Sequence, residues 1–108
     1  MKAILINPTY RMVQEIQIKE GNDLEALQEL YRLVGEEALD AAHIMPGEAI
    51  YLGDHSALQD PPLASYTVEG YRHPLYGPGV LIGHDKLGKE RETKLTVDDL
   101  WELITWLS

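Results

Sequence analysis

The sequence predicts an α+β domain in which a mixed or antiparallel sheet of about five strands carries two helices packed on it. One observation is that amphipathic helical patterns occur at residues 23–34 and 97–107, whereas short β-prone segments fill most of the rest. Another is that helices and strands do not alternate regularly, as they do in the βα units of a parallel sheet. The chain of 108 residues has the size of one domain, so we expect a single core for residues 1–108.

The beginning of the chain is typical of a β-hairpin. Residues 2–6 form an apolar run that ends at Asn7 and Pro8, and residues 12–20 alternate between apolar and polar side chains. Alternation with a period of two indicates a strand with one buried face. We therefore expect two antiparallel strands here.

The first helix has a start signal and a stop signal. Asn22 is a suitable N-cap and Glu25 follows three residues later, as in a capping box, while Gly35 is a suitable C-terminal stop. The predicted buried stripe consists of Leu24, Leu27, Leu30, Tyr31 and Val34. This pattern predicts a helix that lies across a sheet.

The middle of the chain predicts a second hairpin and then a loop. Residues 38–44 and 49–53 are β-prone and flank the turn-forming tetrad Met-Pro-Gly-Glu at 45–48. Residues 54–62 contain two adjacent prolines, which do not fit inside a central strand, so we expect a loop there. Residues 63–68 are predicted to form a strand.

Residues 70–79 contain two prolines and three glycines, so we expect irregular structure there. Residues 80–84 are apolar and β-prone, and the turn-like segment 85–88 follows them. The charged segment 89–94 is suited to an exposed edge strand.

The helix at 97–107 has the strongest local signature in the chain. Thr96 is the predicted N-cap, Asp99 occupies the third helical position, and Leu95 is placed to pack on Leu100. The predicted buried stripe is Val97, Leu100, Trp101, Ile104 and Leu107. Trp106 falls off this stripe and is a candidate for exposure or for a subunit contact.

The composition excludes several classes of function. The formal net charge is −9, and residues 1–70 carry 12 acidic and 4 basic residues while residues 71–108 carry 6 and 5. Such a surface disfavours nucleic-acid binding, which relies on lysine and arginine. Cysteine is absent, so thiolate chemistry and cysteine-ligated metals are excluded. No apolar run suits a signal peptide or a membrane span, and we expect a cytoplasmic protein without a cofactor.

Histidines and carboxylates raise the question of a metal site. The neighbours Asp54 and His55, and likewise His84 and Asp85, would point to opposite faces in a strand, so neither pair is a local chelate. We therefore predict no metal site. His43 lies between apolar residues and is interpreted as a hydrogen-bonded structural histidine.

No catalytic motif is present. The serines lie outside a Gly-x-Ser-x-Gly elbow, and the glycine-rich segment 70–79 matches neither the Walker pattern nor the dinucleotide fingerprint. We predict no catalytic residues and a protein that is not an enzyme.

The most ligand-like cluster is in the segment 70–79. Tyr71, Arg72, His73 and Tyr76 combine aromatic rings with a guanidinium, which suits a planar or anionic ligand. The alternative is structural: the tyrosines cover the edge of the sheet and Arg72 pairs with a neighbouring carboxylate. If the chain binds an anion, these four residues are the predicted ligand-binding residues.

An ordered set of motifs carries a family resemblance. It consists of KAILINP at 2–8, the helix at 23–35, GEAIYL at 47–52, HPLYGPGVLIG at 73–83 and KLTVDDL at 94–100. Together they resemble a domain of unknown function carried by phages, plasmids and their bacterial hosts. The resemblance covers nearly the whole chain and transfers no catalytic residue. It implies a phage or mobile-element accessory protein that acts on host machinery or host signals.

Two hypotheses of function follow. The leading one is a noncatalytic accessory protein that binds a host protein in the host cytoplasm through its acidic first half; counteracting a host defence is one form of it. The alternative is a protein that binds or sequesters a small ligand, a nucleotide or a similar anionic metabolite. Direct nucleic-acid and membrane partners are not expected, and the assembly is open between a monomer and a homodimer.

Overall fold

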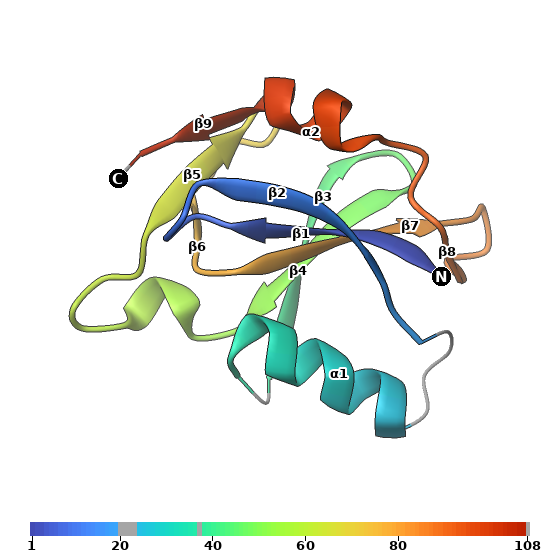
Figure 1. The fold of residues 1–108 in the computed structure, drawn as a ribbon, viewed down its shortest axis with the longest axis horizontal. Helices are drawn as coiled ribbons and strands as arrows, with labels where there is room; N and C mark the ends of the chain where they lie inside the picture. The colour runs from blue at the N-terminus through green and yellow to red at the C-terminus, as the bar shows by residue number, and fades with distance from the viewer. Residues whose placement is uncertain (20–23, 37, 108) are drawn as a thin grey trace.

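The computed structural model describes residues 1–19, 24–36 and 38–107, which form three layers (Figure 1). The central sheet has the strand order β2-β1-β7-β4-β3, and β8 pairs with β7 beside this path. Helix α1 covers one face of the sheet, and α2 with a second sheet of order β6-β5-β9 covers the other. The elements are β1 Lys2–Asn7, β2 Met12–Gln17, α1 Leu24–Val34, β3 Leu39–Met45, β4 Glu48–Gly53, the 3-10 turn η1 Ser56–Leu58, β5 Ser65–Val68, β6 Leu75–Tyr76, β7 Gly79–His84, β8 Glu90–Arg91, α2 Val97–Leu103 and β9 Ile104–Trp106.

The predicted α+β class with two helices is confirmed, and every strand pair in the described residues is antiparallel. The prediction of about five strands in one sheet is too low, because there is a six-stranded sheet and a separate three-stranded one. Strand β8 lies within the segment 89–94, which is predicted as an edge strand, but it has only two residues. Strand β9 lies within the predicted second helix, and β6 has two residues within a segment predicted to be irregular. A strand as short as β6 leaves no alternating pattern for a sequence to reveal.

Helix α1 forms where the sequence predicts it. The expected N-cap Asn22 lies outside the described residues. At the other end Gly35 has a φ of 81°, and its N–H donates to the carbonyl of Tyr31 at 2.8 Å, so the predicted stop is confirmed. Leu30 and Val34 are buried and pack in one cluster with residues of β1 and β7.

Strand β7 lies in the centre of the sheet and serves both faces. Val80 and Ile82 belong to the cluster under α1, whereas Leu81 belongs to the larger cluster on the opposite face. This follows from the alternation of side chains along a strand. The larger cluster also contains Tyr66 from β5 and Leu100 from α2, so α2 and the small sheet share one core with the central sheet.

The prediction of one helix over 97–107 is wrong in its second half. Helix α2 ends at Leu103, and residues 104–106 form β9, which pairs with β5. Ile, Thr and Trp favour strands, and the free edge of β5 supplies the hydrogen-bonding partner that a helix would not use. The first half is confirmed, since Thr96 and Asp99 form a reciprocal capping box. These bonds from the Thr96 backbone and side chain lower the pKa of Asp99 below its usual value.

The expected burial of Trp101 is also wrong. Its side chain is 49% exposed, whereas its neighbour Leu100 is fully buried. The Trp101 ring lies edge-on to Trp106 at 5.7 Å between centroids, and Trp106 in turn packs against Tyr66 at 5.9 Å. Leu100 rather than Trp101 therefore anchors the helix to the core.

Within the described residues, no helix is both long enough and apolar enough to cross a membrane.

Candidate functional site

A cavity of about 180 Å³ lies where β4 leaves the central sheet. Three separate segments enclose it: the beginning of β3, the turn η1 that follows β4, and the loop that leads into β6. Its position is set by topology, because β3 and β4 form a hairpin whose open end faces the loop from the small sheet. Polar residues from all three segments meet there.

Three of the four residues predicted to bind a ligand line this cavity. Tyr71, His73 and Tyr76 contribute to its wall, and the rings of Tyr71 and His73 meet edge-on at 6.2 Å between centroids. Arg72 is exposed and is not part of the wall. The structure therefore brings together the aromatic part of the predicted cluster and leaves its guanidinium outside.

The aromatic loop is tied to the small sheet at both ends. The N–H of Tyr71 donates to the carbonyl of Val68 at 3.0 Å, and Tyr76 pairs with Ser65 through β6 and β5. Directly before Tyr71, Gly70 has a φ of 88°, which favours glycine. These constraints hold the two tyrosines half-buried on one side of the loop.

Glu36 fixes the opposite wall, and no motif in the sequence points to this residue. Its Oε2 accepts a hydrogen bond from the hydroxyl of Ser56 at 2.7 Å, and its Oε1 accepts one from the backbone N–H of His55 at 3.0 Å. A Cβ at Gly53 would lie 1.9 Å from Oε2, so glycine at this position leaves the space that the carboxylate occupies. The carboxylate thus clamps the segment after β4 to the end of α1.

This arrangement is not that of a catalytic serine. Ser56 is 5% exposed, and its hydroxyl donates to Glu36 rather than to a histidine. The His55 ring lies beside the same carboxylate, with Nδ1 3.6 Å from Oε1. Without a serine–histidine hydrogen bond the imidazole does not activate the hydroxyl as a general base would.

The wall of the cavity is acidic. Among the described residues that line it, Asp40 and Asp54 are acidic and none is a lysine or an arginine. One oxygen of Asp40 accepts the N–H of Ala41 at 2.9 Å, and Asp54 is half-exposed, 4.0 Å from the His55 ring. Two carboxylates beside two tyrosine rings favour a cationic group over an anionic one.

Of the two histidine pairs considered for metal binding, His84 and Asp85 have other partners, whereas the His55 ring lies beside both Asp54 and Glu36. The His84 Nε2 lies 2.8 Å from the hydroxyl of Tyr51, and Asp85 accepts two backbone N–H groups in its own turn. Across the described ranges, no three or more His, Asp or Glu side chains gather in a way that would hold a metal ion. His43, interpreted as a hydrogen-bonded structural residue, lies exposed on β3 instead.

Comparison with protein-family models, with curated proteins and with solved structures finds no match to this chain.

Proposed function

We propose that this protein is a binding protein that holds a partner protein by inserting a lysine or arginine side chain of the partner into the cavity at the end of β4. The single observation that carries this proposal is the wall of the cavity. It combines Asp40 and Asp54 with Tyr71 and Tyr76, and the part of the wall that the structure describes contains no lysine or arginine.

The size and chemistry of the cavity suit the end of a basic side chain. About 180 Å³ accommodates an ammonium or guanidinium group with part of its methylene stem. Tyrosine faces attract a cation by roughly 0.5–2 kcal/mol, depending on its desolvation. The carboxylates provide charge-assisted hydrogen bonds, and Leu52 and Leu75 offer apolar wall for the stem.

The charge of the whole chain supports a basic partner. A net charge of −9 attracts positively charged surfaces and raises their rate of association, most strongly at low salt. The resemblance to a phage and plasmid domain makes a host protein in the host cytoplasm the proposed partner. In that setting, occupying a functional basic side chain of a host defence protein would block it.

The test is a titration of ¹⁵N-labelled protein with Nα-acetyl-lysine methylamide and Nα-acetyl-arginine methylamide, followed by NMR. The proposal expects shifts at Gly53, Tyr71 and Tyr76, and weaker binding in 0.5 M salt. Asp40→Asn/Asp54→Asn should weaken binding by about tenfold or more, since it removes both charges from the wall.

The matched control is Asp98→Asn/Glu102→Gln, which removes two exposed charges from α2. This control separates a local effect from an effect of net charge. Equal weakening in both double variants, or shifts located away from the cavity, would contradict the proposal. Capture of host proteins on wild type and on both variants would then show whether a natural partner depends on the same carboxylates.

A further inference from the structure

A second, larger cavity lies at the opposite end of β4. It has a volume of about 480 Å³ and is bordered by the β3–β4 turn, the end of β7, and the segment through β8 to residue 94. Strand β4 has six residues, so the two ends lie about 17 Å apart at about 3.3 Å per residue. The volume falls in the range of about 300–1,000 Å³ that small-molecule sites occupy.

The wall of this cavity is basic. Lys86, Arg91 and Lys94 line it, which is three of the nine lysines and arginines in the chain. Both lysines are exposed, and their ammonium groups have no hydrogen-bond or ion-pair partner among the described residues. The acidic residue in the wall is Asp85, whose Oδ1 accepts the N–H groups of Leu87 and Lys89 at 2.9 Å each.

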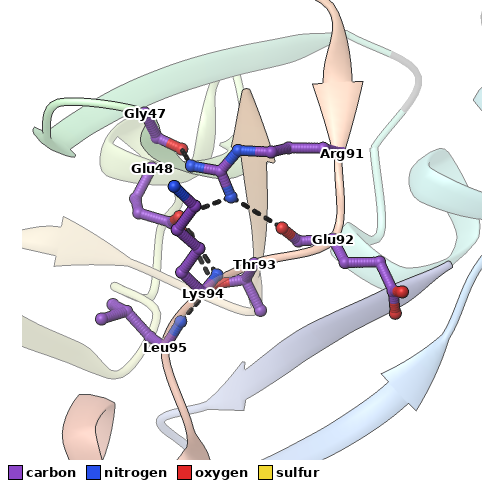
Figure 2. Close-up of polar contacts among 7 residues, drawn as sticks. All are labelled: Gly47, Glu48, Arg91, Glu92, Thr93, Lys94 and Leu95. Atoms are coloured by element: carbon purple, nitrogen blue, oxygen red, sulfur yellow. Dashed lines mark hydrogen bonds and ion pairs between the residues drawn. The ribbon is translucent and has the colours of Figure 1, made fainter. Parts of the chain in front are cut away.

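The buried carboxylate of Glu48 holds the guanidinium of Arg91 in place (Figure 2). Its Nη1 donates to Glu48 Oε2 at 3.1 Å and to the carbonyl of Glu92 at 2.7 Å, and its Nη2 donates to the carbonyl of Gly47 at 3.2 Å. Glu48 is 3% exposed and also accepts hydrogen bonds from the Thr93 hydroxyl and the Lys94 N–H. The same carboxylate therefore fixes the guanidinium and the backbone that carries Lys94.

Two glycines make room for this guanidinium. A Cβ at Gly47 would lie 2.8 Å from Arg91 Nη2, and one at Gly83 would lie 2.4 Å from Nη1 and 2.6 Å from the carbonyl of Glu92. The guanidinium thus lies directly against the backbone of the sheet. It makes three bonds to the described residues out of five N–H groups, so it retains donors for a ligand.

His84 also lines the cavity, and its ring is hydrogen-bonded to Tyr51. The Tyr51 hydroxyl lies 2.8 Å from Nε2, and burial, with a smaller contribution from Glu90, raises the pKa of Tyr51 above its usual value. When this neutral hydroxyl donates to Nε2, a neutral imidazole carries its proton on Nδ1. Nδ1 is buried and has no hydrogen-bond partner among the described residues.

We propose that this cavity binds a small metabolite carrying a phosphate or diphosphate group. Lys86, Lys94 and Arg91 bind the phosphate oxygens. Two unpaired ammonium groups and a fixed guanidinium are the donor set that phosphate oxygens require. The site does not overlap the cavity proposed for a basic side chain. A long polyanion is disfavoured, because the basic wall ends within this cavity and the remaining surface is acidic.

The test is isothermal calorimetry with inorganic pyrophosphate and ATP at 50 mM salt. Wild type should bind both, with weaker binding at 300 mM salt. Lys86→Gln/Lys94→Gln should lower the affinity by about tenfold or more, because it removes both unpaired charges. The matched control is Arg32→Gln/Arg72→Gln, which removes two exposed charges elsewhere and should retain binding.

The outcomes separate the alternatives. Loss of pyrophosphate binding in the lysine variant alone supports the site. Binding that survives in that variant, or that the control loses equally, overturns it, as does an absence of binding to both probes. Binding of a ten-nucleotide oligothymidylate without binding of pyrophosphate would also overturn the proposal, because the ligand would then be a nucleic acid. None of these results affects the proposal for basic side chains, which Asp40→Asn/Asp54→Asn tests.

Discussion

Replacing Glu48 by glutamine should destabilise the fold although it changes few atoms. The Glu48 carboxylate is buried, and three donors from residues 91–94 converge on it. A glutamine keeps one oxygen, which suffices for the Thr93 hydroxyl. Its NH₂ group would face the guanidinium of Arg91 and the N–H of Lys94. Lys94 would lose its acceptor, and Arg91 would keep only the carbonyls of Gly47 and Glu92.

The magnitude follows from the contacts that are lost. A hydrogen bond to a charged group contributes about 1.5–3 kcal/mol, so the loss of two such bonds sets the upper bound. Two effects reduce it: a neutral amide costs less to bury than a carboxylate, and the Arg91 side chain is 26% exposed, so water replaces part of the lost interaction. We expect a net loss of about 2–3 kcal/mol, against a total stability of about 5–15 kcal/mol for a domain.

Urea denaturation at pH 7, followed by tryptophan fluorescence, measures this loss. The control is Glu92→Gln on the same segment, because this exposed carboxylate accepts a hydrogen bond from the N–H of Lys2 at 2.8 Å. That variant should lose less than about 1 kcal/mol. Equal stability of the two variants would refute the view that Glu48 organises the segment 91–94. A double variant of Glu48 and Arg91 should lose less than the sum of the single ones.

Three further predictions concern other parts of the fold. Gly53→Ala should lower the free energy of unfolding by about 1–3 kcal/mol, because the new Cβ displaces Glu36 and leaves the buried Ser56 hydroxyl unpaired. Thermal unfolding measures this loss, and an unchanged melting temperature would show that Glu36 does not hold the segment after β4. Leu100→Ala should lower the free energy of unfolding by about 2–5 kcal/mol. Trp101→Ala should lower it by less than the roughly 3–5 kcal/mol typical of a buried tryptophan, because Trp101 is half exposed. If urea denaturation gave the reverse order, α2 would pack on its other face. Tyr66→Phe should stabilise the fold by about 1 kcal/mol at pH 7, because the Tyr66 hydroxyl is buried without a hydrogen-bond partner among the described residues. Burial also raises the Tyr66 pKa above its usual value. The hydroxyl therefore loses its proton first in the unfolded chain, and stability falls as the pH rises above about 10. Urea denaturation from pH 8 to 11 should show a smaller fall in stability for Tyr66→Phe than for wild type, and an equal fall in both would contradict the burial of this hydroxyl.

The parts of the fold that the sequence predicted are those with local causes. Thr96 and Asp99 form the capping box that begins α2. Gly35 after α1 and Gly47 in the β3–β4 turn have positive φ angles. Each of these signals acts within a few residues of the element that it begins or ends. The strand β9 could not be predicted in this way. Its residues continue a helical pattern, and the edge of β5 that converts them into a strand lies about 40 residues earlier in the chain.

The candidate site shows the same division. Tyr71, His73 and Tyr76 lie within one short segment, so the sequence alone predicts that they lie near one another. Asp40 and Asp54 reach the same cavity from the β3–β4 hairpin, and only the topology brings them there. The predicted preference for an anion depends on Arg72, which lies outside the wall, and the cation that we propose instead depends on the two carboxylates.

The two ends of β4 carry opposite charge, and this bears on how independent the two proposed sites are. Acidic groups gather at the Gly53 end and basic groups at the Glu48 end, about 17 Å apart along the strand. The Debye length is about 8 Å at physiological salt and about 30 Å at 0.01 M. The sites should therefore act separately at physiological salt but influence one another at low salt. Because the negative end opposes an anion at the basic end, Asp40→Asn/Asp54→Asn should strengthen pyrophosphate binding at 0.01 M and leave it unchanged at 0.15 M. Strengthening of equal size at both salt concentrations would show that the two ends are coupled through the structure of the sheet rather than through their field.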